Sequence, residues 1–352
     1  MGLHSVDGPL PFTAMLCTCQ AGFESLLAEE LRGLSLEIEA QGPGWVSLRA
    51  PEGVAATLDL AFAHRILPDT SDLAGDSVNG LAQQLLEFML NSLRGERIEA
   101  SWPCVFAGPA ELVGLGRRIS AVEKTFNELL RKRLSRVARL ATPDLPRSLG
   151  PVRGLFVWFS DFGRFHVSRT LIQNGPKRMA DDPLAPSRSY LKVEEAYGLL
   201  GVEPGDGETV IDLGAAPGGW SYSAAKRGAR VDAIDNGPLK AGAANNPGII
   251  HRMEDAFRVS PPEGAAYDWL FCDMVEEPHH VLRDIVEPWL SRRWCRRFVI
   301  NLKFGRVRPL GLLDELRSSE SPFVRHASDW RIRHLYHDRE EFTVAGSVRS
   351  AE

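Results

Sequence analysis

The stretch Val210-Ile211-Asp212-Leu213-Gly214-Ala215-Ala216-Pro217-Gly218-Gly219-Trp220 decides the fold expected of this chain. Residues 210–213 are a short apolar run with one acid, which predicts a buried β-strand. The glycines that follow let the backbone approach a ligand closely, and Pro217 suits the first turn of a helix. A dinucleotide fingerprint is excluded, because the residue two places after Gly214 is Ala216 and not glycine. A strand, a turn and a helix can be purely structural, so the evidence for a ligand at this turn has to come from the sequence downstream.

Three further predicted strands each end in an acid. The strand 230–234 ends at Asp235, a strand near 249–253 precedes Asp255, and the strand 269–272 precedes Asp273. In a doubly wound sheet the carboxyl ends of the strands line one crevice, and the acid that ends the second strand binds ribose hydroxyls. A terminal acid often only caps a helix. Three acids in register instead favour a ligand that contains a nucleoside.

The length and composition are those of a globular enzyme with more than one domain. The 352 residues suffice for two or three cores, and 25% charged with 44% hydrophobic residues is ordinary for such proteins. The chain has no apolar run of about eighteen residues and no amino-terminal leader pattern, which favours a cytoplasmic protein without a membrane span. The five cysteines form no C-x-x-C pair, so neither a disulfide framework nor a metal site is expected.

The sequence predicts three units. Residues 1–75 and 76–172 resemble two small α+β units, and residues 173–352 alternate strands and helices, as a mostly parallel sheet requires. A segment rich in proline and polar residues, 175–186, is the expected linker.

A basic amphipathic helix is expected over residues 117–139. This segment holds eight basic residues and two acidic ones, and most basic side chains fall on one arc opposite the apolar ones. A solvated surface or a membrane-binding face would give the same pattern. A second arginine cluster, residues 292–297, is expected near the catalytic end of the sheet and favours phosphate binding. The candidate RNA contacts are Arg117, Lys124, Arg131, Lys132, Arg136 and Arg139.

Four charged residues lie at the ends of predicted elements. Lys192 is in a helix that leads to the first strand, Asp273 ends the fourth strand, Lys303 ends a later strand, and Glu341 begins the last one. Taken alone, Lys192 and Glu341 would be ordinary surface residues. Lys303 is harder to dismiss, because the strand ends of such a sheet face the ligand crevice.

Six short motifs, taken together, resemble a known family. They are Ser-Arg-Ser-x-Leu-Lys at 187–192, Ala-Pro-Gly-Gly-Trp at 216–220, Asp-Asn-Gly-Pro at 235–238, Cys-Asp-Met-Val-Glu at 272–276, Asn-Leu-Lys at 301–303 and Leu-Tyr-His-Asp-Arg-Glu-Glu at 335–341. The set resembles the M family of bacterial 23S ribosomal RNA ribose 2'-O-methyltransferases over nearly the whole chain. Ala216 stands where cysteine is expected in close relatives, and a small side chain should suffice there.

This resemblance implies a Rossmann-like, doubly wound α/β methyltransferase domain, preceded by a ferredoxin-like unit and a THUMP-type RNA-binding unit. It implies S-adenosylmethionine (SAM) as cofactor and a cytidine in domain V of 23S ribosomal RNA, near the peptidyl-transferase centre, as target. The RNA would be protein-free or in an early assembly intermediate, and no obligate protein partner is implied. The implied cofactor-binding residues are Ser189, Gly214, Ala216, Pro217, Gly218, Gly219, Trp220, Asp235, Asp255 and Asp273.

The order Lys192, Asp273, Lys303, Glu341 resembles the catalytic tetrad of this family. Lys303 is expected to take the proton of the ribose 2'-hydroxyl, for which its amine must be neutral. Lys192 and the SAM sulfonium are expected to lower the pKa of Lys303. Asp273 would orient Lys303, and Glu341 would hold the ribose or Lys192.

Two other functions stay open on the sequence alone. An RNA base methyltransferase of the same fold would need an aromatic-rich N/D-P-P-F/Y loop after the fourth strand or a nucleophilic cysteine, whereas residues 273–276 are Asp-Met-Val-Glu. A non-catalytic RNA-binding protein would have no need of the four charged residues. Tyr336 and His337 are interpreted as packing or RNA-facing residues.

Overall fold

The computed structural model describes residues 11–146 and 148–350 of the chain. They form two compact units, the first ending at Asn174 and the second beginning at Gly175. Residues 1–10, on which the expectation about a leader rests, lie outside the described residues. Within the described part, no helix is both long enough and apolar enough to cross a membrane.

One mixed sheet runs through the first unit, in the order β2-β3-β1-β4-β9-β8-β6-β7, with β5 paired to β9. The strands are β1 Phe12–Thr18, β2 Glu37–Gly42, β3 Trp45–Pro51, β4 Arg65–Leu67, β5 Ser71–Ala74, β6 Trp102–Ala107, β7 Ala141–Thr142, β8 Gly150–Phe159 and β9 Arg164–Gln173. Helix α1, Glu24–Gly33, contacts β2 and β3. Because β4 pairs with β9, the sheet continues across the sequence boundary expected near residue 75.

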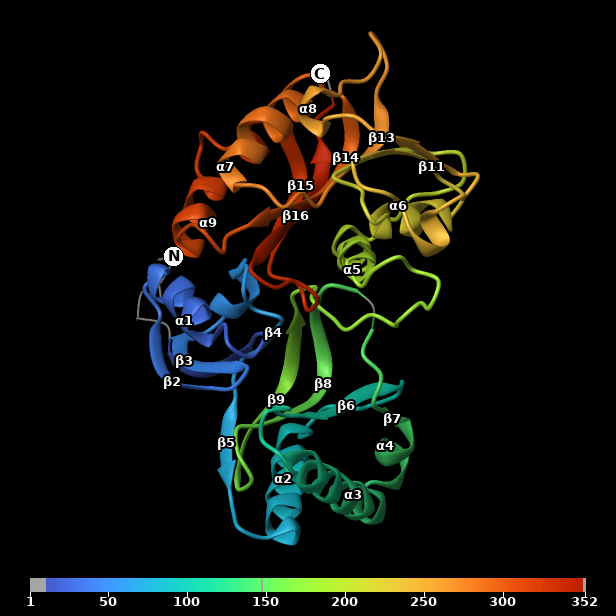
Figure 1. The fold of residues 1–352 in the computed structure, drawn as a ribbon. Helices are drawn as coiled ribbons and strands as arrows, with labels where there is room; N and C mark the ends of the chain where they lie inside the picture. The colour runs from blue at the N-terminus through green and yellow to red at the C-terminus, as the bar shows by residue number, and fades with distance from the viewer. Residues whose placement is uncertain (1–10, 147, 351–352) are drawn as a thin grey trace, which may run out of the picture. The chain divides into compact units, whose positions relative to one another are not determined.

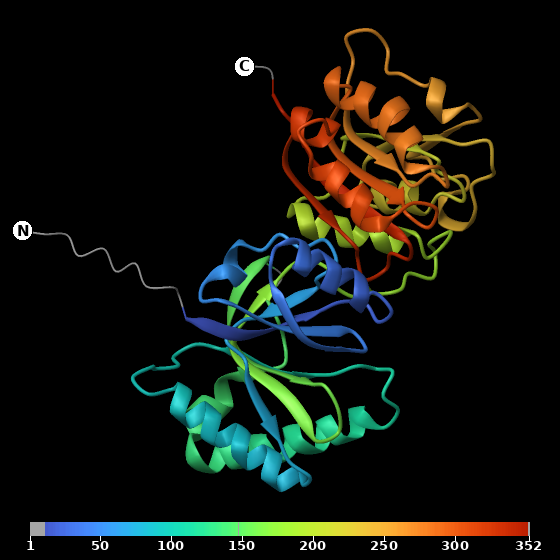
Figure 2. The same ribbon diagram turned by 90° about the vertical axis from the view of Figure 1, so that its left-hand side faces the viewer.

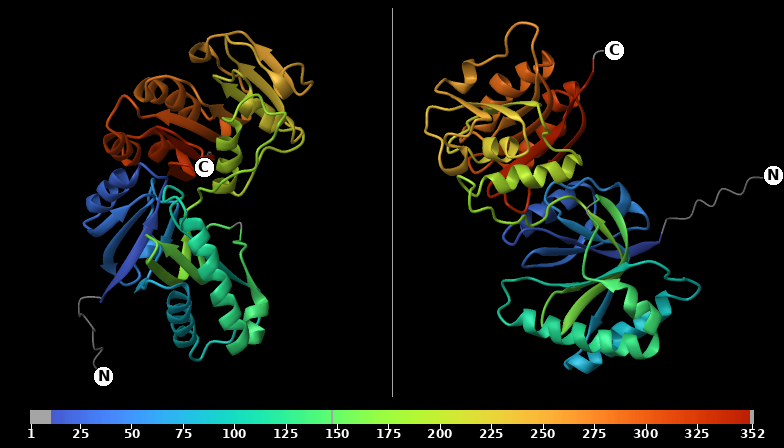
Figure 3. Two further views of the ribbon diagram at one scale, coloured as in Figure 1. Left: turned by 60° about the horizontal axis from the view of Figure 1, so that its bottom comes forward. Right: turned by 90° about the vertical axis from the view of Figure 1, so that its right-hand side faces the viewer.

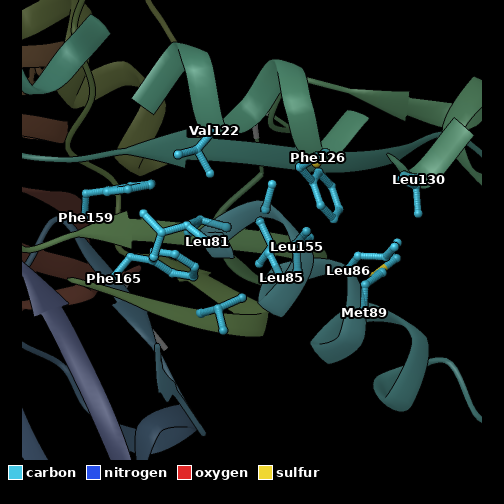
Figure 4. Packing of buried hydrophobic residues seen from close by; sticks show 14 of the residues in the cluster. Leu81, Leu85, Leu86, Met89, Val122, Phe126, Leu130, Leu155, Phe159 and Phe165 are labelled. Carbon is cyan, nitrogen blue, oxygen red and sulfur yellow. The ribbon is translucent and has the colours of Figure 1, made fainter. Parts of the chain in front are cut away.

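Two helices, α2 (Val78–Ser92) and α3 (Leu115–Arg133), pack side by side in the same unit (Figure 2). The Ser77 side chain begins α2 by accepting the Gly80 N–H at 3.0 Å. Figure 4 shows the apolar faces of both helices pointing into one core together with residues of β8 and β9. The periodic apolar residues of α3 thus face this core, as predicted. They include Val122, Phe126 and Leu130.

The basic helix is shorter than predicted. Leu134 leaves the helical region, with φ −140° and ψ 65°, and a separate helix α4 spans Ser135–Leu140. The apolar period continues across this break, because Leu134 and Val137 still pack against the core. The Val137 carbonyl accepts a hydrogen bond from the Trp102 indole N–H at 2.9 Å, which ties α4 to β6. A pattern of apolar residues cannot reveal such a break, and the prediction of one helix over 117–139 was wrong.

The second unit has a seven-stranded sheet in the order β12-β11-β10-β13-β14-β16-β15. The strands are β10 Thr209–Leu213, β11 Arg230–Ile234, β12 Ile249–Arg252, β13 Tyr267–Cys272, β14 Cys295–Lys303, β15 Ala327–Arg333 and β16 Glu341–Val348. The first five pair in parallel, whereas β16 runs antiparallel to both β14 and β15. The strand order reverses between β10 and β13, which is where doubly wound sheets bind ligands.

Helices cover both faces of this sheet. Figure 1 shows α5 and α6 on one side and α7, α8 and α9 on the other, and α5 contacts β16 (Figure 3). The helices are α5 Tyr190–Leu200, α6 Gly219–Ala225, α7 Pro278–Val281, α8 Glu287–Ser291, α9 Pro309–Arg317 and α10 Pro322–His326, and a π-helical turn, Leu282–Val286, joins α7 to α8.

The second arginine cluster, residues 292–297, does not lie near the catalytic end of the sheet. It precedes and begins β14, whereas Lys303 ends this strand. Strands rise about 3.3 Å per residue, so the length of β14 separates the two positions. Arg296 pairs with Asp268 at 2.9 Å, and Arg297 pairs with Glu208 at 3.3 Å. The expectation was wrong because it ignored the direction of the strand.

Candidate functional site

The glycine turn joins β10 to α6 at the carboxyl edge of the sheet. Gly214 (φ +77°) and Gly218 (φ +102°) adopt left-handed conformations that favour glycine. A Cβ on Gly214 would lie 2.6 Å from Met274 Cγ, and one on Gly218 would lie 2.5 Å from Ala243 Cβ. There is therefore no room for a side chain at either glycine, and the turn packs on Met274, the residue after Asp273. Helix α6 begins only at Gly219, so the prediction that Pro217 lies in its first turn was wrong.

Two serine hydroxyls lie against the start of α6. Ser187 Oγ and Ser189 Oγ are 2.7 Å apart, and a Cβ on Gly219 would lie 2.9 Å and 2.7 Å from them. Gly219 therefore leaves these hydroxyls room beside the turn. This places Ser189, predicted from the sequence, next to the glycines. The Trp220 side chain, also predicted to bind the cofactor, instead lies in the core, where its indole N–H donates to the Ser189 carbonyl at 2.9 Å.

The acids that end β11 and β12 lie where the sequence places them. The carboxylate of Asp235 accepts the Ala216 N–H at 3.0 Å and the Gly237 N–H at 2.7 Å, so it braces the turn. Each oxygen keeps a lone pair for a further donor such as a ribose hydroxyl. Asp255 caps a short 3-10 helix by accepting the Phe257 N–H at 3.0 Å, and its side chain is about half exposed.

Lys192, Asp273, Lys303 and Glu341 form one closed cluster, the lysine–carboxylate tetrad. Lys303 Nζ lies 2.5 Å from Asp273 Oδ1 and 2.7 Å from Glu341 Oε2. Lys192 Nζ contacts Glu341 Oε1 and lies 3.6 Å from Asp273 Oδ2. Each lysine therefore bridges both carboxylates, and the formal charges of the four groups cancel. Helix α5 and the strands β13, β14 and β16 together supply the tetrad.

The carboxylates of the tetrad shift the protonation of their partners. Burial alone would lower the pKa of Lys303, but Asp273 and Glu341 outweigh burial and raise it. Burial alone would raise the pKa of Glu341, yet Lys192 and Lys303 outweigh burial and hold it at about 2. The expectation that Lys303 has a lowered pKa considered only the nearby cations. For the protein alone the sign is the opposite.

Lys303 is the member of the tetrad that is most open to solvent. Its side chain is 23% exposed, against 11% for Lys192, 14% for Asp273 and 5% for Glu341. It borders a cavity of about 370 Å³, which is within the size range of small-molecule pockets. The loops after β13 and β14, the start of α7 and the segment that leads into β16 line this cavity with Val275, Glu276, Glu277, Pro278, Gly305, Arg306, Arg339, Glu340 and the first residue of β16, Glu341.

A buried carboxyl that sequence reasoning missed ties α5 to the segment before β16. Glu195 accepts the N–H groups of Lys177 (2.6 Å), Tyr336 (2.9 Å) and His337 (3.2 Å). Burial raises its pKa to about 8, against the lowering effect of these hydrogen bonds. His337 itself accepts the Met179 N–H at 2.9 Å, a packing role as the sequence suggested. In the sequence, only the position of Glu195 one helical turn after Lys192 could have indicated that this acid lies near the site.

A second buried acid lies in β10 itself. Asp212 is 1% exposed and accepts the hydroxyl hydrogen of Ser221 at 2.6 Å. Burial raises its pKa to about 7, against this hydrogen bond, and the negative charge of Asp273 adds to the rise. Its presence in an apolar run was visible in the sequence, but its partner on α6 was not.

All six basic residues proposed to contact RNA are exposed. Arg117, Lys124, Arg131 and Lys132 lie on α3, and Arg136 and Arg139 lie on α4. Neighbouring Arg118 instead donates to the backbone carbonyls of Asp76 and Phe162 and has a structural role.

Comparisons with known proteins relate this chain to methyltransferases. The FtsJ-like methyltransferase family model matches residues 185–298, and the RlmL ferredoxin-like domain matches residues 14–67. Ribosomal RNA large subunit methyltransferase M of Alkalilimnicola ehrlichii is 33% identical, over 94% of this chain and 94% of its own length. The protein of the same name from Halorhodospira halophila is 34% identical, over 93% and 94%. In structure, a possible methylase from Clostridium difficile 630 aligns over 97% of this chain and 100% of its own, with 14% identity and a TM-score of 0.37.

The first two relatives cover nearly all of this chain. The comparisons confirm an α/β methyltransferase domain preceded by a ferredoxin-like unit, and they support ribosomal RNA methylation. The predicted cofactor, SAM, is confirmed as well, and the glycine turn with Asp235 fits it. The chain belongs to the ribosomal RNA large subunit methyltransferase M family.

Proposed function

We propose that this chain transfers the methyl group of SAM to the ribose 2'-hydroxyl of a cytidine in 23S ribosomal RNA, in domain V near the peptidyl-transferase centre. The observation that carries the proposal is the lysine–carboxylate tetrad, whose most exposed member, Lys303, borders a cavity lined by the residues that follow Met274. A hydroxyl nucleophile needs a base within hydrogen-bond reach, and a lysine amine can act as one when neutral. The segment Asp273-Met274 links the two sites, because Met274 packs on Gly214.

Four groups of this chain have distinct roles in the proposed reaction. SAM, when bound at the glycine turn, supplies an electrophilic methyl group and a positive charge. A positive charge near Asp273 favours the neutral form of Lys303, which opposes the raised pKa seen in the protein alone. Neutral Lys303 takes the hydroxyl proton at its Nζ atom. Asp273 and Glu341 then stabilise the resulting ammonium, and Lys192 balances their charge.

The first unit provides the proposed RNA contacts. We assign residues 1–75 to the ferredoxin-like part, 76–172 to a THUMP-type RNA-binding part and 173–352 to the methyltransferase domain. The exposed basic residues of α3 and α4 would contact phosphates, on RNA that is protein-free or in an early assembly intermediate, without an obligate protein partner.

Mapping 2'-O-methyl groups on ribosomal RNA from a deletion strain tests the function. Loss of one methylated cytidine in domain V is expected, and an unchanged map would contradict the proposal.

Replacing Asp235 by alanine should weaken SAM binding about ten-fold or more, because hydrogen bonds to a charged acceptor are worth about 1.5 to 3 kcal/mol. Calorimetric titration of the full chain with SAM measures the loss. Glu254→Ala is the matched control, since this acid follows the neighbouring strand β12 and pairs with Arg252 at 2.8 Å. Equal SAM affinity in folded Asp235→Ala and Glu254→Ala proteins would remove the ribose-binding role of Asp235.

Replacing Arg131, Lys132 and Arg136 together by alanine should weaken RNA binding on every sequence while SAM affinity stays unchanged. Each lost phosphate contact lowers the salt dependence, so the slope of log K against log salt should fall by about 2 to 3. Filter binding at several salt concentrations measures both quantities. The matched control removes three arginines at the amino end of β14: Arg292, Arg293 and Arg296. If the control loses as much RNA affinity as the α3 and α4 variant, these helices have no special role.

A further inference from the structure

A chain of buried polar side chains runs behind Asp273, outside the tetrad. Asn301 on β14, Thr343 on β16 and Asp338 before β16 are each at most 2% exposed. The Asn301 amide donates to Asp273 Oδ1 at 3.2 Å, and the Thr343 hydroxyl lies 2.7 Å from Asn301 Oδ1. The two carboxyl oxygens of Asp338 lie 3.2 Å and 3.0 Å from Thr343 Oγ1, and one of them accepts the Leu335 N–H at 2.8 Å.

The number of hydrogens available for donation determines which group is the donor in each of these hydrogen bonds. Asp273 pairs with two lysines as a carboxylate and can only accept, so Asn301 must turn its NH₂ group toward Asp273 and its oxygen toward Thr343. Thr343 has a single hydroxyl hydrogen, and the Asn301 oxygen takes it. The remaining contact of Thr343 therefore needs Asp338 as the donor, which requires a protonated carboxyl.

The surroundings of Asp338 agree with a protonated carboxyl. Its burial, together with the negative charge of Glu341, raises its pKa to about 8, although Lys192 and the hydrogen bond from the Leu335 N–H act in the opposite direction. A protonated Asp338 supplies the donor that the Thr343 oxygen needs, while the Thr343 hydrogen stays on the Asn301 oxygen.

The chain ends on the oxygen of Asp273 that also binds Lys303. Asp273 Oδ1 accepts from Asn301 at 3.2 Å and from Lys303 at 2.5 Å, while Oδ2 faces Lys192 at 3.6 Å. A carboxylate at the end of a strand can rotate about its Cβ–Cγ bond unless a hydrogen bond holds it. Asn301 supplies this bond from the adjacent strand, so it holds the plane of the Asp273 carboxylate in the orientation that meets both lysines.

We propose that Asn301 is a positioning residue for methyl transfer, which orients Asp273 against Lys303, and that Thr343 and a protonated Asp338 hold the Asn301 amide in place. This inference rests on the proposed function, because it acts through Lys303. In this proposal Asn301, Thr343 and Asp338 act through Asp273, whereas the tetrad acts on the substrate. A misplacement of reacting groups by about 1 Å can cost about 10²-fold in rate.

The experiment removes the Thr343 hydroxyl with little change in volume. Thr343→Val should lower kcat by about ten- to a hundred-fold, with the KM for undermodified 23S ribosomal RNA and the Kd for SAM unchanged. Thr343→Ser, which restores the hydroxyl, should recover most of the rate. Thr209→Val is the matched control, because the Thr209 hydroxyl also donates to a side-chain oxygen, that of Asp268 at 3.0 Å, but at the amino end of β10. If Thr343→Val does not fold, Asn301→Ala carries the same test, with SAM binding as proof of folding.

A second pair of variants tests the direction of the chain. Asp338→Asn keeps both a donor for Thr343 and an acceptor for Leu335, so it should retain most of the activity, whereas Asp338→Ala should not. An Asp338→Asn protein as slow as Thr343→Val would overturn the assigned direction. If RNA that the wild-type protein has methylated carries no new 2'-O-methyl group, the proposed function is wrong. Ribose methylation by the wild type with equal kcat in Thr343→Val and Thr209→Val would overturn the positioning role alone.

Discussion

Replacing Lys303 by alanine should lower the rate of methyl transfer to 23S ribosomal RNA by about 10² to 10⁴-fold, which is the usual contribution of a general base. The larger value is expected, because Lys303 also borders the cavity in which the hydroxyl would be oriented. Single-turnover transfer of labelled methyl from SAM to undermodified RNA measures this rate. SAM affinity should stay unchanged, since the glycine turn and Asp235 lie on other elements.

Lys303→Arg separates the role of a base from the role of a positive charge. Arginine can still pair with Asp273 and Glu341, but it stays protonated in proteins and cannot accept the hydroxyl proton. We expect the arginine variant to be as slow as the alanine variant. An arginine variant with near wild-type rate would show that position 303 contributes only charge, and the assignment of the base would then be wrong.

Replacing Glu341 by glutamine should lower the free energy of unfolding by about 3 kcal/mol at pH 7, because it leaves two partly buried lysines with a neutral partner. Glu341 is 4% exposed and contacts both Lys192 and Lys303. Urea unfolding of the full chain measures the change. Glu340→Gln is the matched control, since the adjacent carboxylate is exposed. Equal stability of the two variants would contradict a stabilising role of the tetrad.

This stabilisation should depend on pH in one direction. The Glu341 carboxyl has a pKa of about 2 in the folded protein, because Lys192 and Lys303 outweigh its burial, and 4.5 as its ordinary value. A depressed pKa stabilises the fold above the unfolded value and loses this effect as the pH falls. The difference in stability between wild type and Glu341→Gln should therefore shrink as the pH falls from about 5 toward about 2. A difference that grows toward acidic pH would contradict the ion pairs.

Local features of the sequence were sufficient to predict the parallel strands of the methyltransferase sheet and the residues at their carboxyl ends. The apolar run 210–213, the glycines after it and the acids Asp235 and Asp273 are consecutive signals, each read within a few residues. Parallel strands then place the acids at one edge by topology. Lys303 followed from the same rule, whereas Glu341 was assigned only through the family resemblance. The register of the antiparallel pair β14 and β16 sets the two residues directly opposite each other.

The features that could not be predicted depend on partners far away in the sequence. The Asn301, Thr343 and Asp338 chain joins two strands and a loop, and nothing local shows which acid of the segment 338–341 turns inward. The break of the basic helix at Leu134 leaves the apolar period intact. The sign of the Lys303 pKa shift depends on two carboxylates whose contact distances only the fold determines.

The most direct test of the account identifies the atom that receives the methyl group. Undermodified 23S ribosomal RNA is incubated with the protein and methyl-labelled SAM, and the product is digested in alkali. Alkaline cleavage needs a free 2'-hydroxyl, so a 2'-O-methylated cytidine should leave its label in an alkali-stable dinucleotide, and Lys303→Ala should leave none. Label in mononucleotides would mean methylation of a base, and would contradict both the ribose target and the role of Lys303.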